Sequence, residues 1–211
     1  MSGDKTLQPL LEQGLAELGI ALEPQRIDLL LRYVALLHKW NGAYNLTAVR
    51  DPRDMVVRHL LDSLSILPWV TGPSLLDVGA GAGLPGIVLA IARPELAVTL
   101  LDSNGKKVRF QRQAVLELGL DNVVPLHQRV ESLDAGEGFA QIVSRAFAAV
   151  EQFIGLSRSL IAADGEWLAM VGQLNEAPAL PADVALIEQT ALKVPGERAS
   201  RHLLRIAPVR S

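Results

Sequence analysis

The chain has 211 residues, of which 49% are hydrophobic and 20% charged, so it can bury a full core as one domain with a modest addition. The lack of cysteine excludes disulfides and thiolate metal sites, and the formal net charge of -3 gives no overall support to nucleic-acid binding. The sequence shows neither the apolar core of a signal peptide nor a run long enough to span a membrane, so we expect a cytoplasmic protein without a membrane partner.

The first seventy residues are predicted to be helical. Apolar residues recur at helical spacing over 7–18 and 24–40. A third helix is expected from about 52 to 67, because Asp51 is suited to its N-cap and Pro52 to its first turn. We expect residues 1–70 to form a helical cap that packs on the rest of the chain.

Strands and helices alternate from residue 74 onward. Strands are predicted near 74–79, 97–102, 122–127, 140–145, 165–171, 183–190 and 201–207. Helices are predicted near 85–92, with a start at Leu84 or Pro85, near 105–118 and 148–162, and a short one near 173–180. This alternation predicts an α/β domain over 71–211, with a mostly parallel seven-stranded sheet covered by helices on both faces.

A glycine-rich segment follows the first predicted strand. Residues 75–86 read L-L-D-V-G-A-G-A-G-L-P-G, so four glycines come directly after a buried-strand pattern. Glycine lets the backbone turn sharply and approach a ligand without a Cβ atom in the way. No Gly-Lys-Ser/Thr ending follows, which argues against a P-loop, and we expect a site for a nucleotide-bearing cofactor.

The residues around this segment favour one cofactor over another. Residues 81–86 fit the dinucleotide pattern G-x-G-x-x-G, and Asp102 follows at about the distance of a ribose-binding acid. However, Asp77 lies inside the end of the first strand, just before the glycines, and the second strand ends in Leu-Asp-Ser at 101–103, which suits S-adenosyl-L-methionine. Asp102 is predicted to accept hydrogen bonds from the ribose hydroxyls, with an N-cap of the following helix as the alternative.

Two segments are basic on an otherwise acidic chain. Residues 32–60 hold five Lys/Arg against two acids, a net charge of +3, and residues 193–211 hold five against one, a net charge of +4. We predict one RNA-binding face from five arginines of these segments, with ordinary solvated charge as the alternative. These are Arg50, Arg53, Arg58, Arg201 and Arg205.

Several motifs together carry a family resemblance. They are H-K-W-N at 38–41, Y-N-L-T-A-V-R-D-P at 44–52, R-H-L-L-D-S at 58–63, D-V-G-A-G-A-G-L-P-G at 77–86, L-D-S at 101–103, R-V-E at 129–131 and S-R-A-F at 144–147. In this order and spacing the chain resembles, over nearly its whole length, the glucose-inhibited division protein B family of bacterial small-subunit rRNA (guanine-N7) methyltransferases.

The resemblance implies a class I S-adenosyl-L-methionine-dependent methyltransferase fold and methylation of N7 of a guanine in the decoding-region loop of 16S rRNA. The expected partner is 16S rRNA or the 30S subunit, and we expect a monomer without a metal ion. The resemblance also implies cofactor contacts at Gly79, Leu84, Val130, Glu131 and Arg145. Val130 and Glu131 follow the third strand at the carboxyl edge of the sheet, where they can contact the adenine edge.

The end of the fourth strand bears on the methylated atom. Enzymes that methylate exocyclic amino groups commonly carry an Asn/Asp-Pro-Pro-aromatic turn there, whereas this chain has V-S-R-A-F at 143–147. Guanine N7 has a lone pair and no proton, so we expect no catalytic base and acceleration through positioning. Arg145 would hold the cofactor carboxylate or an RNA phosphate, or else pair with Asp77. Phe147 would stack on the flipped guanine or pack in the core.

Some motif residues have structural interpretations beside the functional ones. Trp40 is expected to dock the cap, and His59 is either functional or a buried, hydrogen-bonded histidine. Asn41, Asn45 and Thr47 lie between the second and third helices, where short polar side chains usually close turns.

One position departs from the family pattern. The family typically has a lysine where this chain has Val171, at the end of the fifth strand. If that lysine contacts RNA phosphate, then Arg201 or Arg205 supplies the charge here, or RNA binding is weaker.

Other functions stay open on the sequence. The same fold supports methyltransferases of small molecules or proteins, because a fold does not determine the substrate. A non-enzymatic nucleotide-binding or ribosome-assembly module is the third possibility. Methyl transfer itself would separate the first two from the third.

Overall fold

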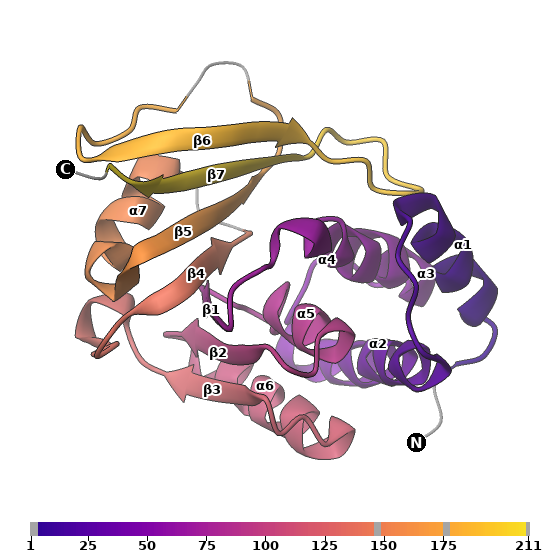
Figure 1. Ribbon diagram of the computed structural model, residues 1–211. Helices are drawn as coiled ribbons and strands as arrows, with labels where there is room; N and C mark the ends of the chain where they lie inside the picture. Colours follow the sequence, from indigo (N-terminus) through magenta and orange to yellow (C-terminus); the bar gives the residue numbers. More distant parts are fainter. Residues whose placement is uncertain (1–3, 146–148, 175–177, 210–211) are drawn as a thin grey trace.

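The chain folds around a seven-stranded sheet (Figure 1). Its strands are β1 (Ser74–Val78), β2 (Ala97–Asp102), β3 (Val123–His127), β4 (Phe139–Ser144), β5 (Ile161–Val171), β6 (Val184–Ala191) and β7 (His202–Pro208). The strand order is β3-β2-β1-β4-β5-β7-β6, parallel from β3 to β5, with β7 antiparallel to both of its neighbours. The computed structural model describes residues 4–145, 149–174 and 178–209. The predicted mostly parallel seven-stranded sheet is confirmed.

Helices precede the sheet and connect its parallel strands. They are α1 (Gln8–Leu18), α2 (Pro24–Tyr44), α3 (Pro52–Met55), α4 (Asp62–Leu64), α5 (Gly86–Ala92), α6 (Gly105–Leu118) and α7 (Val150–Ser157). A π-helical turn, Val56–Leu61, separates α3 from α4, so the third predicted helix is interrupted. Its predicted N-cap is confirmed, because the Asp51 carboxylate accepts a bond from the Arg53 backbone N–H at 2.7 Å. Within the described residues, no helix is both long and apolar enough to cross a bilayer.

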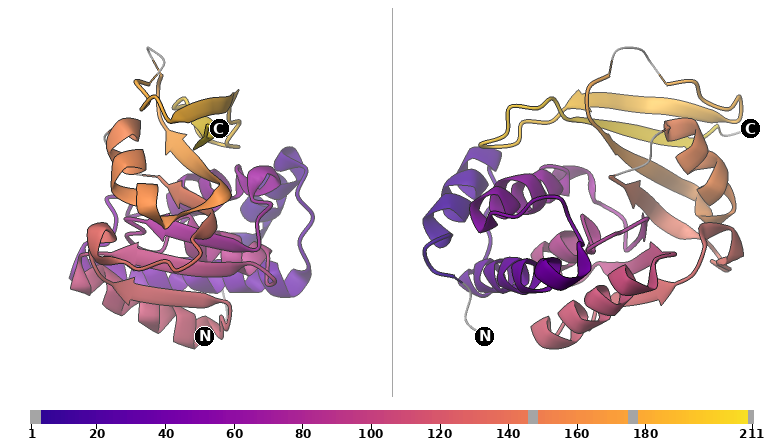
Figure 2. Two further views of the ribbon diagram at one scale, coloured as in Figure 1. Left: turned by 60° about the vertical axis from the view of Figure 1, so that its left-hand side comes forward. Right: turned by 180° about the vertical axis from the view of Figure 1, so that it is seen from behind.

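Both faces of the sheet are covered, as predicted (Figure 2). Successive residues of a strand point to opposite faces. On β1, Leu75 joins a core formed with α1, α2, α5 and α6, whereas Leu76 joins a second core formed with α7. Both leucines have no exposed surface. The apolar pattern of this strand therefore reflects burial on its two faces.

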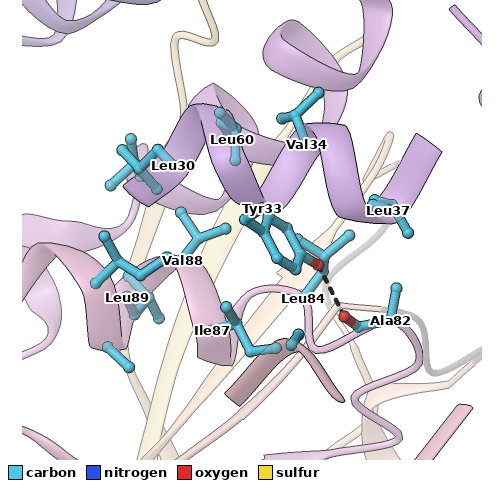
Figure 3. Packing of buried hydrophobic residues seen from close by; sticks show 14 of the residues in the cluster. Leu30, Tyr33, Val34, Leu37, Leu60, Ala82, Leu84, Ile87, Val88 and Leu89 are labelled. Carbon is cyan, nitrogen blue, oxygen red and sulfur yellow. Dashed lines mark hydrogen bonds between the residues drawn. The ribbon is translucent and has the colours of Figure 1, made fainter. Parts of the chain in front are cut away.

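The N-terminal helices share a continuous core with the sheet. Figure 3 shows Tyr33, Val34 and Leu37 of α2 packed against Ile87 and Val88 of α5. All of these side chains are buried, and each contributes about 1.5–3 kcal/mol relative to exposure. The helices of residues 8–64 are thus anchored on the strand-to-helix connection after β1, while a domain boundary at residue 70 stays a prediction.

The fifth strand is longer than predicted, and the helix before it is shorter. The predicted helix over 148–162 ends as α7 at Ser157 and is followed by a 3₁₀ turn, and β5 then begins at Ile161. Gly165 lies inside the strand, where a Cβ atom would be 2.8 Å from the Phe139 carbonyl oxygen. The glycine therefore permits close approach to β4 and does not mark the start of the strand.

One other predicted helix and one predicted helix start are also wrong. The described residues of the predicted helix 173–180 are not helical, because Pro178 and Pro181 lack the N–H groups that a helix needs. In addition, α5 begins at Gly86 and not at Leu84 or Pro85. The chain before it is held in a turn, in which the backbone N–H of Gly83 bonds the Ala80 carbonyl at 2.7 Å.

Candidate functional site

The glycine-rich loop after β1 adopts a backbone that favours glycine. Gly79, Gly81 and Gly83 have φ angles of 70°, 60° and 88°. At Gly83 a Cβ atom would also lie 2.4 Å from the Ile87 side chain. At Gly81, in contrast, the nearest atom would be 3.9 Å away, so the loop backbone is accessible to a ligand there.

Two buried side chains hold this loop from different helices. The Tyr33 hydroxyl of α2 donates to the Ala82 carbonyl at 2.8 Å (Figure 3). Burial raises the pKa of Tyr33, so its hydroxyl remains a donor. The Gln111 amide of α6 donates to the Gly81 carbonyl at 2.9 Å. The N-terminal helices and α6 thus position the loop together.

Asp102 lies beside the loop at the end of β2. Its carboxylate accepts bonds from the backbone N–H groups of Gly81 and Asn104, both at 2.8 Å. The alternative interpretation of Asp102 as an N-cap is wrong, because Asn104 caps α6 by accepting from the Lys106 N–H at 3.0 Å. Each Asp102 oxygen can accept a further hydrogen bond, so the carboxylate remains able to bind a ligand.

Asp77 is the buried acid under the loop. One of its oxygens accepts a bond from the Gly86 N–H at 2.8 Å, whereas the other has no partner within the described residues. Burial raises the pKa of Asp77 to about 7, although the Gly86 bond and the positive charge of Arg145 counteract part of this effect. Asp77 therefore changes its charge near neutral pH.

A first cavity, of about 200 Å³, opens at the carboxyl ends of β1, β2 and β3. Gly79, Asp102, Val130 and Glu131 all line it, so the fold brings together four of the six predicted cofactor residues. Leu84 is not among its lining residues, and its side chain packs in the core beside α2 (Figure 3). The contact predicted at Leu84 stays a prediction.

A second cavity, of about 430 Å³, lies at the carboxyl end of β5, beside the π-helical turn. Arg145 and Arg201 line it and share the buried carboxylate of Asp62, at 3.2 Å and 2.9 Å. Arg145 also donates to the Arg58 carbonyl at 3.0 Å. Its ion pair is thus with Asp62 and not with Asp77, and the two arginines outweigh the charge of the single acid. Phe147 lies outside the described residues.

His59 lies beside the second cavity with both ring nitrogens engaged. Since the Arg58 carbonyl only accepts, Nδ1–H donates to it at 3.0 Å, and Nε2 of the neutral ring accepts from the Thr47 hydroxyl at 2.9 Å. Burial, with the nearby Arg145 charge, lowers the pKa of His59 to about 4. His59 is therefore a buried, hydrogen-bonded neutral histidine, one of the two predicted possibilities.

Polar side chains close the loop before α3, as the structural interpretation predicted, but Asn41 lies within α2, which extends to Tyr44, and not in the loop as predicted. The buried Asn41 amide accepts from the Thr47 N–H at 2.9 Å and donates to the Val49 carbonyl at 3.0 Å. Arg50 donates to the Asn45 side chain at 2.7 Å. Trp40 docks α2 on α6, with its ring centroid 5.9 Å from that of Phe110.

The five predicted arginines do not form one basic face. Arg58 and Arg201 pair with acids near the second cavity, but Arg205 pairs with Glu166 and Glu188. Arg205 lines a separate cavity that includes residues 71–73, at the amino end of β1. Of the two arginines considered as replacements for the family lysine, Arg201 lines the same cavity as Val171.

Sequence reasoning missed three residues that organise the site. Asp62 lies within the 58–63 motif, and an acid in a segment rich in leucine was an available signal of a buried charge. Tyr33 and Gln111 lie on helix faces among apolar neighbours, and nothing in the local pattern distinguishes them from other core positions.

The chain is similar to known proteins over most of its length. Residues 26–204 match the family described as GidB, rRNA small subunit methyltransferase G. A ribosomal RNA small subunit methyltransferase G from Chromohalobacter salexigens is 61% identical, with 93% of this chain and 95% of that protein covered. The protein of the same name from Marinobacter nauticus is 56% identical, with 93% of each chain covered.

The fold has relatives among solved structures. A SAM-dependent methyltransferase from Thiobacillus denitrificans, in complex with S-adenosyl-L-homocysteine, superposes with a TM-score of 0.52 at 12% identity. The superposition covers 71% of this chain and 90% of that chain. The predicted class I methyltransferase fold is confirmed.

Proposed function

This chain belongs to the rRNA small subunit methyltransferase G family, and we propose on this premise that it transfers the methyl group of S-adenosyl-L-methionine to N7 of a guanine in the decoding-region loop of 16S rRNA. The family match over most of the chain carries this proposal. The substrate is 16S rRNA, free or within the 30S subunit, and the activity belongs in the cytoplasm. A monomeric state and independence of metal ions stay predictions.

The first cavity fits the nucleoside part of the cofactor. Its volume of about 200 Å³ is below the range of about 300–1,000 Å³ typical of sites for whole drug-sized ligands, so the methionine part extends beyond it, past Gly79. Asp102 has lone pairs left for the ribose hydroxyls, and Val130 and Glu131 lie where they can contact the adenine. The unpaired buried oxygen of Asp77 is a further polar group under the loop.

The residues of the chain bind and orient the reactants. When bound, S-adenosyl-L-methionine supplies an electrophilic methyl group on sulfur. Asp62 holds Arg145 and Arg201 in place through two ion pairs. These two arginines present positive charge to a neighbouring RNA phosphate or cofactor carboxylate. No base is needed for N7, and His59 is not available as one, because both its nitrogens are engaged. Positioning of N7 in line with the methyl–sulfur bond accounts for the acceleration.

Cofactor binding can be tested at the glycine loop. Gly79→Val introduces a β-branched residue at a φ of 70° beside the first cavity, and we expect S-adenosyl-L-methionine binding to be lost in calorimetry. Gly19→Val is the matched control, because Gly19 has a φ of 69° at the end of α1, and beyond its chain neighbours no atom of the described residues lies within 4 Å of the place that its Cβ would take. Equal affinity in the Gly79 variant would contradict the assignment, as would tighter binding of a nicotinamide cofactor.

The methylated atom can be tested with a modified substrate. An rRNA fragment with 7-deazaguanine at the target position should bind but not react, because it lacks N7. At saturating cofactor, the single-turnover rate on normal rRNA should stay nearly flat from about pH 6 to 9, since the pKa of His59 is about 4 and N7 needs no deprotonation. Asp77, with a pKa of about 7, is controlled for by repeating the measurement with Asp77→Asn. Methylation of the analogue, or a rate governed by one ionisation that persists in Asp77→Asn, would exclude N7 as the acceptor.

A further inference from the structure

A fourth cavity, of about 670 Å³, lies between α6 and the carboxyl end of α2, outside the site described above. Its wall on α6 includes Arg109, Arg112 and Leu116, which share one face because they are three and four residues apart. Tyr44 also lines the cavity and stacks on Trp40, with the ring centroids 5.0 Å apart. We call this cavity the α6 groove.

The positive side chains of the α6 groove have no acidic partners. Lys106, Arg109 and Arg112 are exposed, and no ion pair involves them within the described part of the chain. Their neighbour Lys107, in contrast, lies 3.9 Å from Asp102. None of the described residues that line the groove is an aspartate or a glutamate. This wall therefore differs from the second cavity, whose arginines are paired, and it is suited to an external polyanion.

The α6 groove adjoins the first cavity on one side. His127 lines the groove, and its Nε2 donates at 3.1 Å to the carbonyl of Ser103, which lines the first cavity. On the other side, Tyr44 is followed by the loop whose residues Ala48 and Val49 line the second cavity. An extended strand can thus contact both the α6 groove and the second cavity by crossing this loop.

We propose that the α6 groove binds the phosphate backbone of rRNA next to the target guanine, through Lys106, Arg109 and Arg112. The proposal rests on the proposed function, because it concerns the same rRNA substrate. Lys106 and Arg112 are six residues apart, about 9 Å along the helix axis at 1.5 Å per residue, so the three residues present a row of charge and not a single point. Such contacts position the RNA without reading its sequence.

The test compares two variants of the full chain that each lose two positive charges. Arg109→Gln/Arg112→Gln removes charge from the groove. Lys5→Gln/Lys193→Gln removes it from exposed positions before α1 and between β6 and β7. Binding to protein-free 16S rRNA is measured across a range of salt concentrations. The groove variant should bind more weakly at low salt, and its slope of log K against log salt should be shallower by about 1.5, at about 0.7–0.9 per lost phosphate contact.

Other readouts separate the groove from the chemistry. The groove variant should keep wild-type affinity for S-adenosyl-L-methionine, and its KM for rRNA should rise by a larger factor than its kcat falls. Wild-type affinity and salt slope in the groove variant would overturn the inference, and so would an equal loss in the control variant. A loss seen with 30S subunits but not with protein-free rRNA would assign the groove to a protein partner and overturn it too. Failure of the proposed function is distinct, since the wild-type protein would then transfer no methyl group to rRNA.

Discussion

Replacement of Asp77 by asparagine should remove a pH dependence of stability that the wild-type protein carries. Asp77 is fully buried, and burial raises its pKa from 3.8 to about 7. This rise in the pKa corresponds to about 4 kcal/mol, because a tenfold change in an equilibrium constant is worth about 1.4 kcal/mol. Because the folded state has the higher pKa, it keeps a proton that the unfolded state loses between pH 4 and 7. The free energy of unfolding therefore falls as pH rises through this window and then levels off.

Denaturant unfolding without cofactor, at pH 5 and pH 8, measures this effect. The wild-type protein should lose about 2–3 kcal/mol more than Asp77→Asn between the two values, because the asparagine cannot ionise. Its amide oxygen can still accept the Gly86 hydrogen bond. His59 acts in the opposite direction, since its pKa is lowered to about 4 and stability is lost as pH falls from 6.5 toward 4. Both proteins contain His59, so its contribution cancels in the difference.

A stability difference between the two proteins that stays constant from pH 5 to pH 8 would refute this reasoning. Asp77 would then have the same pKa in the folded and unfolded states, so its burial would be fully compensated by interactions such as the Gly86 bond. The ionisation of Asp77 should also affect cofactor binding. If Asp77 lies under the bound cofactor, wild-type affinity for S-adenosyl-L-methionine should change near pH 7, whereas the affinity of Asp77→Asn should not.

Three substitutions test the residues that organise the site. Tyr33→Phe leaves the Ala82 carbonyl without its donor and should lower the free energy of unfolding by about 1–3 kcal/mol, with weaker cofactor binding in calorimetry. Gly86→Ala places a Cβ atom 2.4 Å from a Leu100 methyl carbon, and overpacking should lower the free energy of unfolding by about 1–3 kcal/mol in denaturant titrations. Asp62→Asn removes the carboxylate shared by two arginines and should cost about 3 kcal/mol, and methyl transfer should fall more than cofactor affinity.

Each substitution has a control of the same chemistry. Tyr44→Phe removes a hydroxyl with no hydrogen bond among the described residues and should leave cofactor affinity unchanged. Gly42 lies in α2, and outside that helix no atom of the described residues lies within 4 Å of the Cβ that Gly42→Ala adds, so this variant should be neutral or stabilised by up to about 1 kcal/mol. Asp54→Asn changes an exposed acid and should be nearly silent. Equal effects in a variant and its control would refute the corresponding assignment.

The sequence by itself determined the order of the seven strands, the mostly parallel sheet and the position of the glycine-rich loop. These features follow from local patterns: apolar runs predict β1 to β5, helical spacing predicts α2 and α6, and closely spaced glycines predict a backbone with positive φ. Asp102, Val130 and Glu131 could be placed together because they follow parallel strands whose carboxyl ends share one edge of the sheet. Motifs at 38–63 and 77–147 were specific enough to indicate the family.

Only the tertiary structure decided which charges meet. Asp62 is separated from its partners Arg145 and Arg201 by 83 and 139 residues, and no local pattern encodes such a pairing. Arg201 and Arg205 are close in the sequence and carry the same charge. However, β7 runs antiparallel to β5, so Arg205 lies toward the amino end of β1, where it forms ion pairs with Glu166 and Glu188. The pKa of Asp77 likewise depends on how completely the surrounding core excludes water, which is a property of the packed fold and not of the neighbouring residues in the chain.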